Sequence, residues 1–307
     1  MQKIIHFLFI LIVSFVTLLG PTAVFASSDK ISVFVSIAPQ SYLVKQIGGQ
    51  YVDVQTLIPP GQEPHVFAPN PRQVVSLGEA RIFFKIGLSF EESLLAKIAS
   101  SHKSLQIIDM AEGVAYRMMT GSHDHRENEN SKDPHVWLGV SQLRQVAVNV
   151  KKALESVDPG NKDYYDQRLL SFLHELQSVH KHAEQKLAPF KGEKLYVFHP
   201  AFGYFADTYD LVQKPVEIEG KSPSPRQLAA LIAQARKEGV RVIFVQPQFD
   251  PKSAGTVAKA IGGTVVSMDS LAENILKNIE EMADKVAAGF SQRKELTPLS
   301  KSNRRNM

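Results

Sequence analysis

Two stretches of the sequence alternate short apolar or β-branched runs with amphipathic segments, and this alternation limits the fold more than any other feature. In the first stretch the predicted strands cover 31–37, 51–58, 81–86 and 105–109, with helices at 40–47, 71–77 and 91–99. In the second stretch the strands cover 195–198, 215–218, 240–245 and 264–268, with helices at 202–208, 225–239, 251–261 and 272–288. Strands that are connected through helices lie parallel in one sheet. We therefore predict an α/β fold of two mostly parallel sheets flanked by helices.

A long amphipathic segment separates the two stretches. After a helix that Ser141 is expected to cap, apolar residues from Tyr165 to Leu187 recur at three- and four-residue steps. A single helix of roughly 25 residues would be nearly 40 Å long at about 1.5 Å per residue. We expect a rigid linker helix over 161–189, which joins an N-terminal lobe (27–160) to a C-terminal lobe (190–290).

The first 26 residues resemble a secretory signal peptide. Lys3 precedes an apolar run from Ile4 to Leu19, and small residues surround Ala26 where a signal peptidase would cleave. The chain contains no cysteine, which excludes disulfides, thiolate ligands and the acylated cysteine of bacterial lipoproteins. The sequence predicts a soluble periplasmic protein without a lipid anchor.

Charge gives no indication of a nucleic-acid partner. The formal net charge is +4, and the basic residues are scattered apart from a polar, basic tail at 291–307 that we expect to be disordered. Hydrophobic residues make up 44% of the chain, which is enough for a large core. A monomeric globular protein is expected.

Three histidines share an unusual setting, because each lies beside a proline and an apolar residue. They are His65, His135 and His199, and Asp269 follows the last predicted strand. In open α/β sheets, ligands bind beyond the carboxyl ends of the strands. Three imidazoles and one carboxylate suit Zn²⁺ in four-fold coordination. We predict that these side chains converge on one metal ion between the lobes.

Three further residues are secondary ligand candidates. Glu63 lies two residues before His65, just beyond the carboxyl end of the predicted strand at 51–58. His123 and His125 belong to a polar stretch, 118–132, that is typical of a mobile loop and could supply accessory metal ligands.

The chain resembles the zinc- and manganese-binding subunits of bacterial metal ABC transporters. The resemblance runs from about Ile31 to Ala288, and its motifs are Pro59-Pro60-Gly61-Gln62-Glu63-Pro64-His65, Asp133-Pro134-His135-Val136-Trp137-Leu138, Phe198-His199-Pro200-Ala201-Phe202-Gly203-Tyr204-Phe205, Glu219-Gly220-Lys221-Ser222-Pro223-Ser224-Pro225 and Phe244-Val245-Gln246-Pro247-Gln248-Phe249. It implies two α/β lobes, a rigid helix, and a periplasmic receptor that delivers its metal to a membrane permease driven by a cytoplasmic ATPase.

The resemblance also implies the roles of individual residues. It maps the metal ligands onto His65, His135 and His199, with the fourth position at Asp269. Because some members of the family leave that position to a glutamate or to water, Glu63 and water are the alternatives here. Manganese binders of this family usually carry glutamate at the third position, so His199 indicates zinc, with manganese as the alternative. The histidines of the 118–132 loop agree with a zinc-type member.

Two other functions compete with this interpretation. A metallohydrolase would leave one zinc position open for water, with Glu63 as its general base. A surface adhesin is the second alternative, which the predicted periplasmic location disfavours. We expect a receptor without enzymatic activity, whose metal affinity falls toward pH 6 as the imidazoles take up protons.

Overall fold

The computed structural model describes residues 30–98, 104–119, 132–217 and 224–295. Within these ranges the chain forms eight strands and nine α-helices. The strands are β1 (Ile31–Val35), β2 (Val52–Thr56), β3 (Ile82–Lys85), β4 (Gln106–Asp109), β5 (Lys194–Val197), β6 (Val212–Pro215), β7 (Val242–Val245) and β8 (Thr264–Ser267). The helices are α2 (Ala38–Gly48), α3 (Pro71–Gly78), α4 (Ser89–Ile98), α5 (Val140–Val157), α6 (Lys162–Leu187), α7 (Gly203–Thr208), α8 (Pro225–Lys237), α9 (Pro251–Ala260) and α10 (Ile275–Glu295).

The strands form two parallel four-stranded sheets with the same topology. The first sheet has the order β2-β1-β3-β4 and the second the order β6-β5-β7-β8. All pairs are parallel, as in the register Val33↔Val54 of β1 and β2. The predicted fold class, two α/β lobes with parallel sheets, is therefore confirmed.

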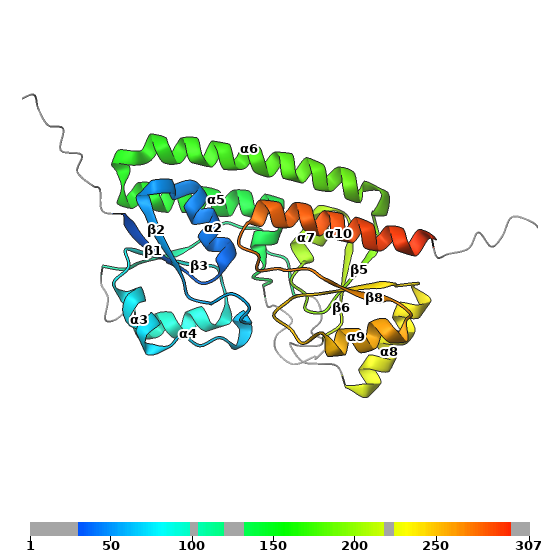
Figure 1. Ribbon diagram of the computed structural model, residues 1–307. Helices are drawn as coiled ribbons and strands as arrows, with labels where there is room; N and C mark the ends of the chain where they lie inside the picture. Colours follow the sequence, from blue (N-terminus) through cyan, green and yellow to red (C-terminus); the bar gives the residue numbers. More distant parts are fainter. Residues whose placement is uncertain (1–29, 99–103, 120–131, 218–223, 296–307) are drawn as a thin grey trace, which may run out of the picture. The chain divides into compact units, whose positions relative to one another are not determined.

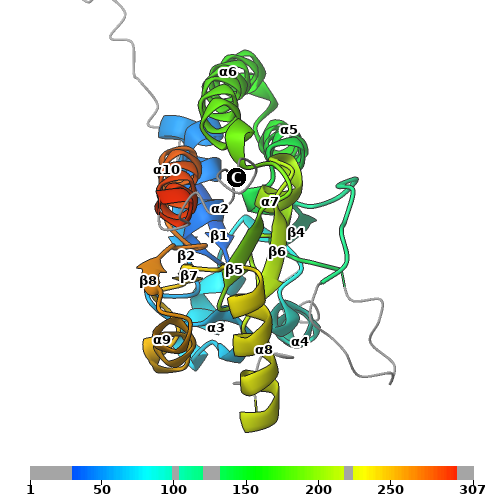
Figure 2. The ribbon, with the colours of Figure 1, turned by 90° about the vertical axis from the view of Figure 1, so that its right-hand side faces the viewer.

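Helices cover both faces of the sheets. Figures 1 and 2 show α2, α5, α6 and α10 on one side and α3, α4, α8 and α9 on the other. A central strand covered on both faces tends to be apolar, and all four residues of β7, VIFV, are apolar and buried. Helices α3, α8 and α9 start where the sequence predicts. In each, the residue before the first helical proline, Asn70, Ser224 or Asp250, accepts a hydrogen bond from a backbone N–H of the first turn.

The longest helix, α6, has 26 residues and packs against elements of both lobes. It contacts α2 and α5 of the N-terminal lobe and α10 at the C-terminal end of the chain. Tyr165, Leu176 and Ala183 on its inner face are fully buried. The helix thus connects the two lobes as the amphipathic pattern predicts (Figure 1).

Three elements differ from the sequence prediction. Helix α5 starts at Val140 with Gly139 as its N-cap, and Ser141 does not cap it. Strand β6 lies three residues earlier than predicted. Helix α10 starts at Ile275 and continues to Glu295, into the segment predicted to be a disordered tail, because Phe290 is buried and its ring packs 5.5 Å from that of Phe190.

Two predictions at the ends of the chain cannot be compared with the structure. The signal peptide at 1–26 and the tail from 296 onward lie outside the described residues. Within the described ranges, none of the helices combines the length and apolar character needed to cross a bilayer.

Candidate metal centre

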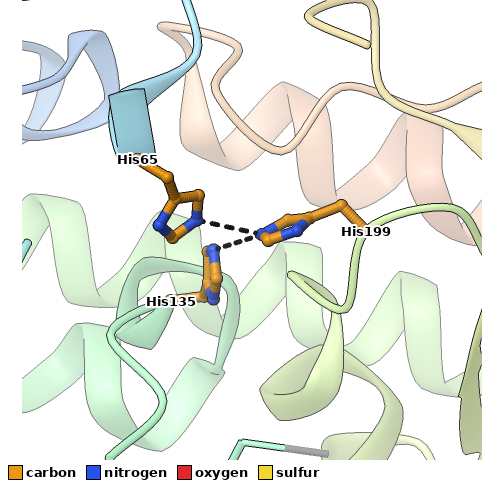
Figure 3. A group of neighbouring side chains, drawn as sticks. All are labelled: His65, His135 and His199. Atoms are coloured by element: carbon orange, nitrogen blue, oxygen red, sulfur yellow. Dashed lines mark hydrogen bonds between the residues drawn. The ribbon is translucent and has the colours of Figure 1, made fainter. Parts of the chain in front are cut away.

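His65, His135 and His199 converge from three separate segments of the chain (Figure 3). His65 belongs to the short 3-10 turn η2 (Pro64–Val66), which follows β2. His135 immediately precedes the 3-10 turn η3 (Val136–Leu138) that leads into α5, and His199 follows β5. The rings of His135 and His199 are buried, whereas His65 is exposed.

The three rings present their Nε2 atoms to one point. The Nε2 of His199 lies 3.2 Å from that of His65 and 3.4 Å from that of His135, and all three ligand atoms lie within 4.8 Å of one another. Two nitrogens bound at about 2.0–2.1 Å to a tetrahedral zinc ion would be about 3.3 Å apart. The spacing therefore suits one small metal ion between the rings.

Carboxylates hold the two buried rings from behind. The Nδ1 of His135 lies 2.7 Å from Asp133 Oδ1, and the Nδ1 of His199 lies 2.6 Å from Glu217 Oε1. Because a carboxylate accepts hydrogen bonds, each Nδ1 is the donor, and each Nε2 carries a lone pair toward the common point. This is the arrangement in which carboxylates orient histidine ligands and raise their basicity.

Further contacts fix the positions of the same two ligands. The fully buried Gln246 accepts a hydrogen bond from the backbone N–H of His199 and donates one to its carbonyl. Phe249 stacks on the His199 ring, with centroids 5.1 Å apart. Trp137 lies beside His135 and donates its indole N–H to the carbonyl of Ser270 at 2.7 Å.

The electrostatics at His65 and His135 favour neutral imidazoles. Although His65 is exposed as a residue, it lines the cleft, and desolvation there, together with the neighbouring His199 and His135 rings, lowers its pKa to about 3. Burial also lowers the pKa of His135, although Asp133 acts in the opposite direction. The sequence analysis expects metal affinity to fall toward pH 6. At His65 and His135 the lowered pKa values move that fall to lower pH, because protons compete with the metal for these rings only there.

The Asp133 carboxyl is held ionised behind its histidine. Burial alone would raise its pKa, but hydrogen bonds from His135 and Arg117 outweigh that effect and hold the pKa below its usual range. An ionised Asp133 keeps the Nδ1–H of His135 engaged and leaves Nε2 free for a metal.

Asp269 and Glu63 do not belong to the group of three converging ligands among the described residues. Asp269 Oδ1 accepts hydrogen bonds from Gln248 Nε2 and from the backbone N–H of Leu271, both at 2.9 Å. It does not cap α10, which starts six residues later. Burial raises the pKa of Glu63, and Glu217 raises it further while His199 opposes the rise.

Sequence reasoning missed Glu217 as a partner of the site. The signal lies in the strand pairing, because β5 and β6 run parallel with Val197 beside Pro215, which brings the residues two positions later, His199 and Glu217, next to each other. The predicted accessory ligands His123 and His125 lie outside the described residues.

The sequence and the fold are similar to those of known proteins. The sequence matches the family described as "Zinc-uptake complex component A periplasmic" over residues 33–289. It is 28% identical over 261 residues to the "High-affinity zinc uptake system protein ZnuA" of Bacillus subtilis, covering 80% of each chain. It is 26% identical over 288 residues to the manganese ABC transporter substrate-binding lipoprotein PsaA of Streptococcus mitis, covering 85% of this chain and 91% of the relative.

Solved structures show the same fold. A crystal structure of ZnuA superposes with a TM-score of 0.80 at 36% sequence identity, covering 85% of this chain and 99% of the other. A ZnuA deletion mutant with zinc bound gives a TM-score of 0.79, also at 36% identity, covering 85% and 98%. The family consists of solute-binding proteins rather than enzymes, and it includes zinc and manganese binders. The chain belongs to the ZnuA family, the metal-binding, substrate-binding components of ABC transporters.

Proposed function

We propose that this protein is a periplasmic zinc receptor that binds Zn²⁺ at His65, His135 and His199 and delivers it to a membrane permease. The observation that carries the proposal is the separation of the Nε2 atoms, 3.2 and 3.4 Å, which matches the spacing around a tetrahedral zinc ion. The permease and its cytoplasmic ATPase are the implied partners, and the receptor acts as a monomer.

Zinc is favoured over manganese by the donor atoms. Imidazole nitrogens suit zinc, whereas manganese prefers carboxylate, carbonyl and water oxygens. Two of the three rings already present a lone pair, because Asp133 and Glu217 engage their Nδ1 atoms. Manganese is the second candidate, since relatives of this chain include manganese transporter components.

Asp269 is our proposed fourth ligand. Its carboxylate is held by Gln248 and Leu271, and both of these residues also line the cleft of the three histidines. Both hydrogen bonds end on Oδ1, so Oδ2 is the oxygen that we expect to bind the ion. Glu63 is the alternative donor from the other lobe.

A titration of the purified protein tests the metal assignment. In competition with a chromogenic chelator, His199→Ala should weaken zinc binding by more than about 100-fold, the upper end of the effect of removing an outer partner of a ligand. His174→Ala is the matched control, because His174 is exposed on α6. Wild-type affinity in His199→Ala would contradict the proposal, and elemental analysis of protein isolated from its own cells would identify the bound metal.

The fourth ligand has a separate test. X-ray absorption of the zinc complex should show three nitrogens and one oxygen, and Asp269→Asn should change the oxygen shell while Glu63→Gln should not. An unchanged spectrum in Asp269→Asn, with a changed one in Glu63→Gln, would assign the position to Glu63.

A further inference from the structure

Arg117 connects the metal centre to the C-terminal lobe through both ends of its guanidinium group. Its Nη1 lies 3.1 Å from Asp133 Oδ2, and its Nε lies 2.9 Å from Asp207 Oδ2. Asp133 is fully buried, and its other oxygen, Oδ1, accepts hydrogen bonds from the Nδ1 and the backbone N–H of His135 at 2.7 and 3.0 Å. One carboxylate thus joins a proposed metal ligand to an arginine that is anchored on α7.

The backbone around Arg117 is tied to the same place. The carbonyl of Arg117 accepts a hydrogen bond from the backbone N–H of Asp133 at 2.9 Å. The hydroxyl of Tyr204, on α7, accepts from the backbone N–H of Arg117 at 3.1 Å and donates to the carbonyl of Asp133 at 2.9 Å. Side-chain and backbone bonds therefore fix Arg117 and Asp133 against one helix of the other lobe.

Gly203, the first residue of α7, provides the space for this arginine. A Cβ atom at Gly203 would overlap the guanidinium group of Arg117, including Nη1 and Cζ. The side chain of Arg117 is 17% exposed, so it lies in a closely fitted position beside α7 rather than in solvent. Only a residue without a side chain permits this approach.

We propose that Arg117 is a positioning residue of the metal centre, which fixes Asp133, and through it the ring of His135, relative to α7 and His199. The proposal rests on the proposed function. His135 and His199 come from different lobes, and their Nε2 atoms lie 3.4 Å apart. A planar guanidinium that bridges two carboxylates, Asp133 at Nη1 and Asp207 at Nε, gives a rigid geometry that a lysine ammonium cannot reproduce.

The sign of the effect separates positioning from simple charge. Arg117 carries a positive charge close to a cation site, so its removal would strengthen metal binding if charge alone mattered. Loss of position would weaken binding, because the loss of an outer partner of a metal ligand typically costs 10- to 100-fold in affinity. The two effects have opposite directions and can be told apart by one measurement.

The test compares Arg117→Gln with Gly203→Ala in the full-length protein. Arg117→Gln should weaken zinc affinity about 10- to 100-fold and change the visible spectrum of the cobalt-substituted protein, which reports ligand geometry. Gly203→Ala keeps the arginine and its charge but displaces the guanidinium, so it should change affinity and spectrum in the same direction. Arg81→Gln is the control, because the exposed Arg81 precedes β3, at the end of the sheet opposite to the site.

The possible results separate this inference from the proposed function. Zinc affinity in Arg117→Gln that equals or exceeds that of the wild type, with an unchanged cobalt spectrum, overturns the positioning role. If Arg117→Gln does not fold, as judged by circular dichroism, Gly203→Ala decides alone, and wild-type affinity and spectrum in that variant overturn the role as well. Wild-type zinc affinity in both His135→Ala and His199→Ala would instead refute the metal site itself.

Discussion

At the scale of single residues, the carboxylates behind the histidines decide which atoms face the ion. Asp133 and Glu217 each engage an Nδ1, so the Nε2 lone pairs of His135 and His199 point inward before any metal is present. His65 has no such carboxylate partner among the described contacts, and its Nε2 meets that of His199 at 3.2 Å. Two ligands are thus oriented in advance, and the third completes the group.

The pH dependence of zinc binding follows from the lowered pKa values of His65 and His135. At pH 5, protonation of each ordinary imidazole ligand, with a pKa of about 6.5, would lower the metal affinity by about 30-fold, and three such ligands would multiply this effect. Because the pKa of His65 is lowered to about 3 and that of His135 is also lowered, protons displace zinc less effectively than this. We expect a smaller loss between pH 7 and pH 5 in competition titrations. A fall by the full product of three ordinary imidazoles would contradict the lowered pKa values.

Glu217→Gln tests the orientation of His199. The amide can present either its oxygen or its NH₂ group to Nδ1, so the tautomer of His199 is no longer fixed, and zinc affinity should fall about 10- to 100-fold. Glu193→Gln is the matched control, because Glu193 belongs to the turn before β5, away from the cleft. Equal affinity in Glu217→Gln and the wild type would show that this carboxylate does not orient the ligand.

At the scale of elements, α6 derives its stability from one buried face. Leu176 is fully buried, while Leu170, on the same helix, is 67% exposed. Leu176→Ala should lower the free energy of unfolding by about 2–5 kcal/mol, because it leaves a cavity, whereas Leu170→Ala should change it by less than about 0.5 kcal/mol. Urea unfolding measures both values. Similar losses in the two variants would contradict the packing of α6.

The elements that the sequence predicted well are those whose residues carry the pattern themselves. Central strands such as β3 and β7 are covered on both faces, so their residues are apolar and easy to recognise, with Lys85 at the end of β3 as the exception. Strand β6 lies at the edge of its sheet, and Lys214 and Pro215 are typical of edge strands, so its position was predicted three residues too late.

The histidines of the site could be predicted, but most of their partners could not. Neighbouring prolines mark His65, His135 and His199 in the sequence. Glu217 becomes a partner through the pairing of β5 with β6, and Asp269 turns toward Gln248, which follows the neighbouring strand β7. Such contacts depend on which strands are neighbours and on side-chain orientation, which periodicity does not contain.

At the scale of the whole molecule, α6 limits how far the lobes can separate. It contacts α2 and α5 of the N-terminal lobe and α10 of the C-terminal lobe, so a wide hinge opening would break packing on its buried face. We expect zinc to slow hydrogen exchange in the turn that carries His65 and to leave the exchange of α6 unchanged. Equal exchange of that turn with and without zinc, or a large change in α6, would contradict this expectation.

Metal binding should also stabilise the folded protein as a whole. A ligand that binds only the folded state at 100 times its dissociation constant adds about 2.7 kcal/mol. A thermal scan with excess zinc should raise the unfolding temperature of the wild type and of His174→Ala, but not that of His199→Ala. A rise of the same size in His199→Ala would place the bound zinc elsewhere.

The unequal exposure of the three rings has a consequence for how fast the ion exchanges. His65 is open to solvent, while His135 and His199 are buried behind it. An arriving ion would form its first bond at the outer imidazole and trade its remaining hydration water for the inner pair. Release of the ion would follow the reverse order. A partner protein that displaces His65 first would therefore control the rate at which the ion leaves.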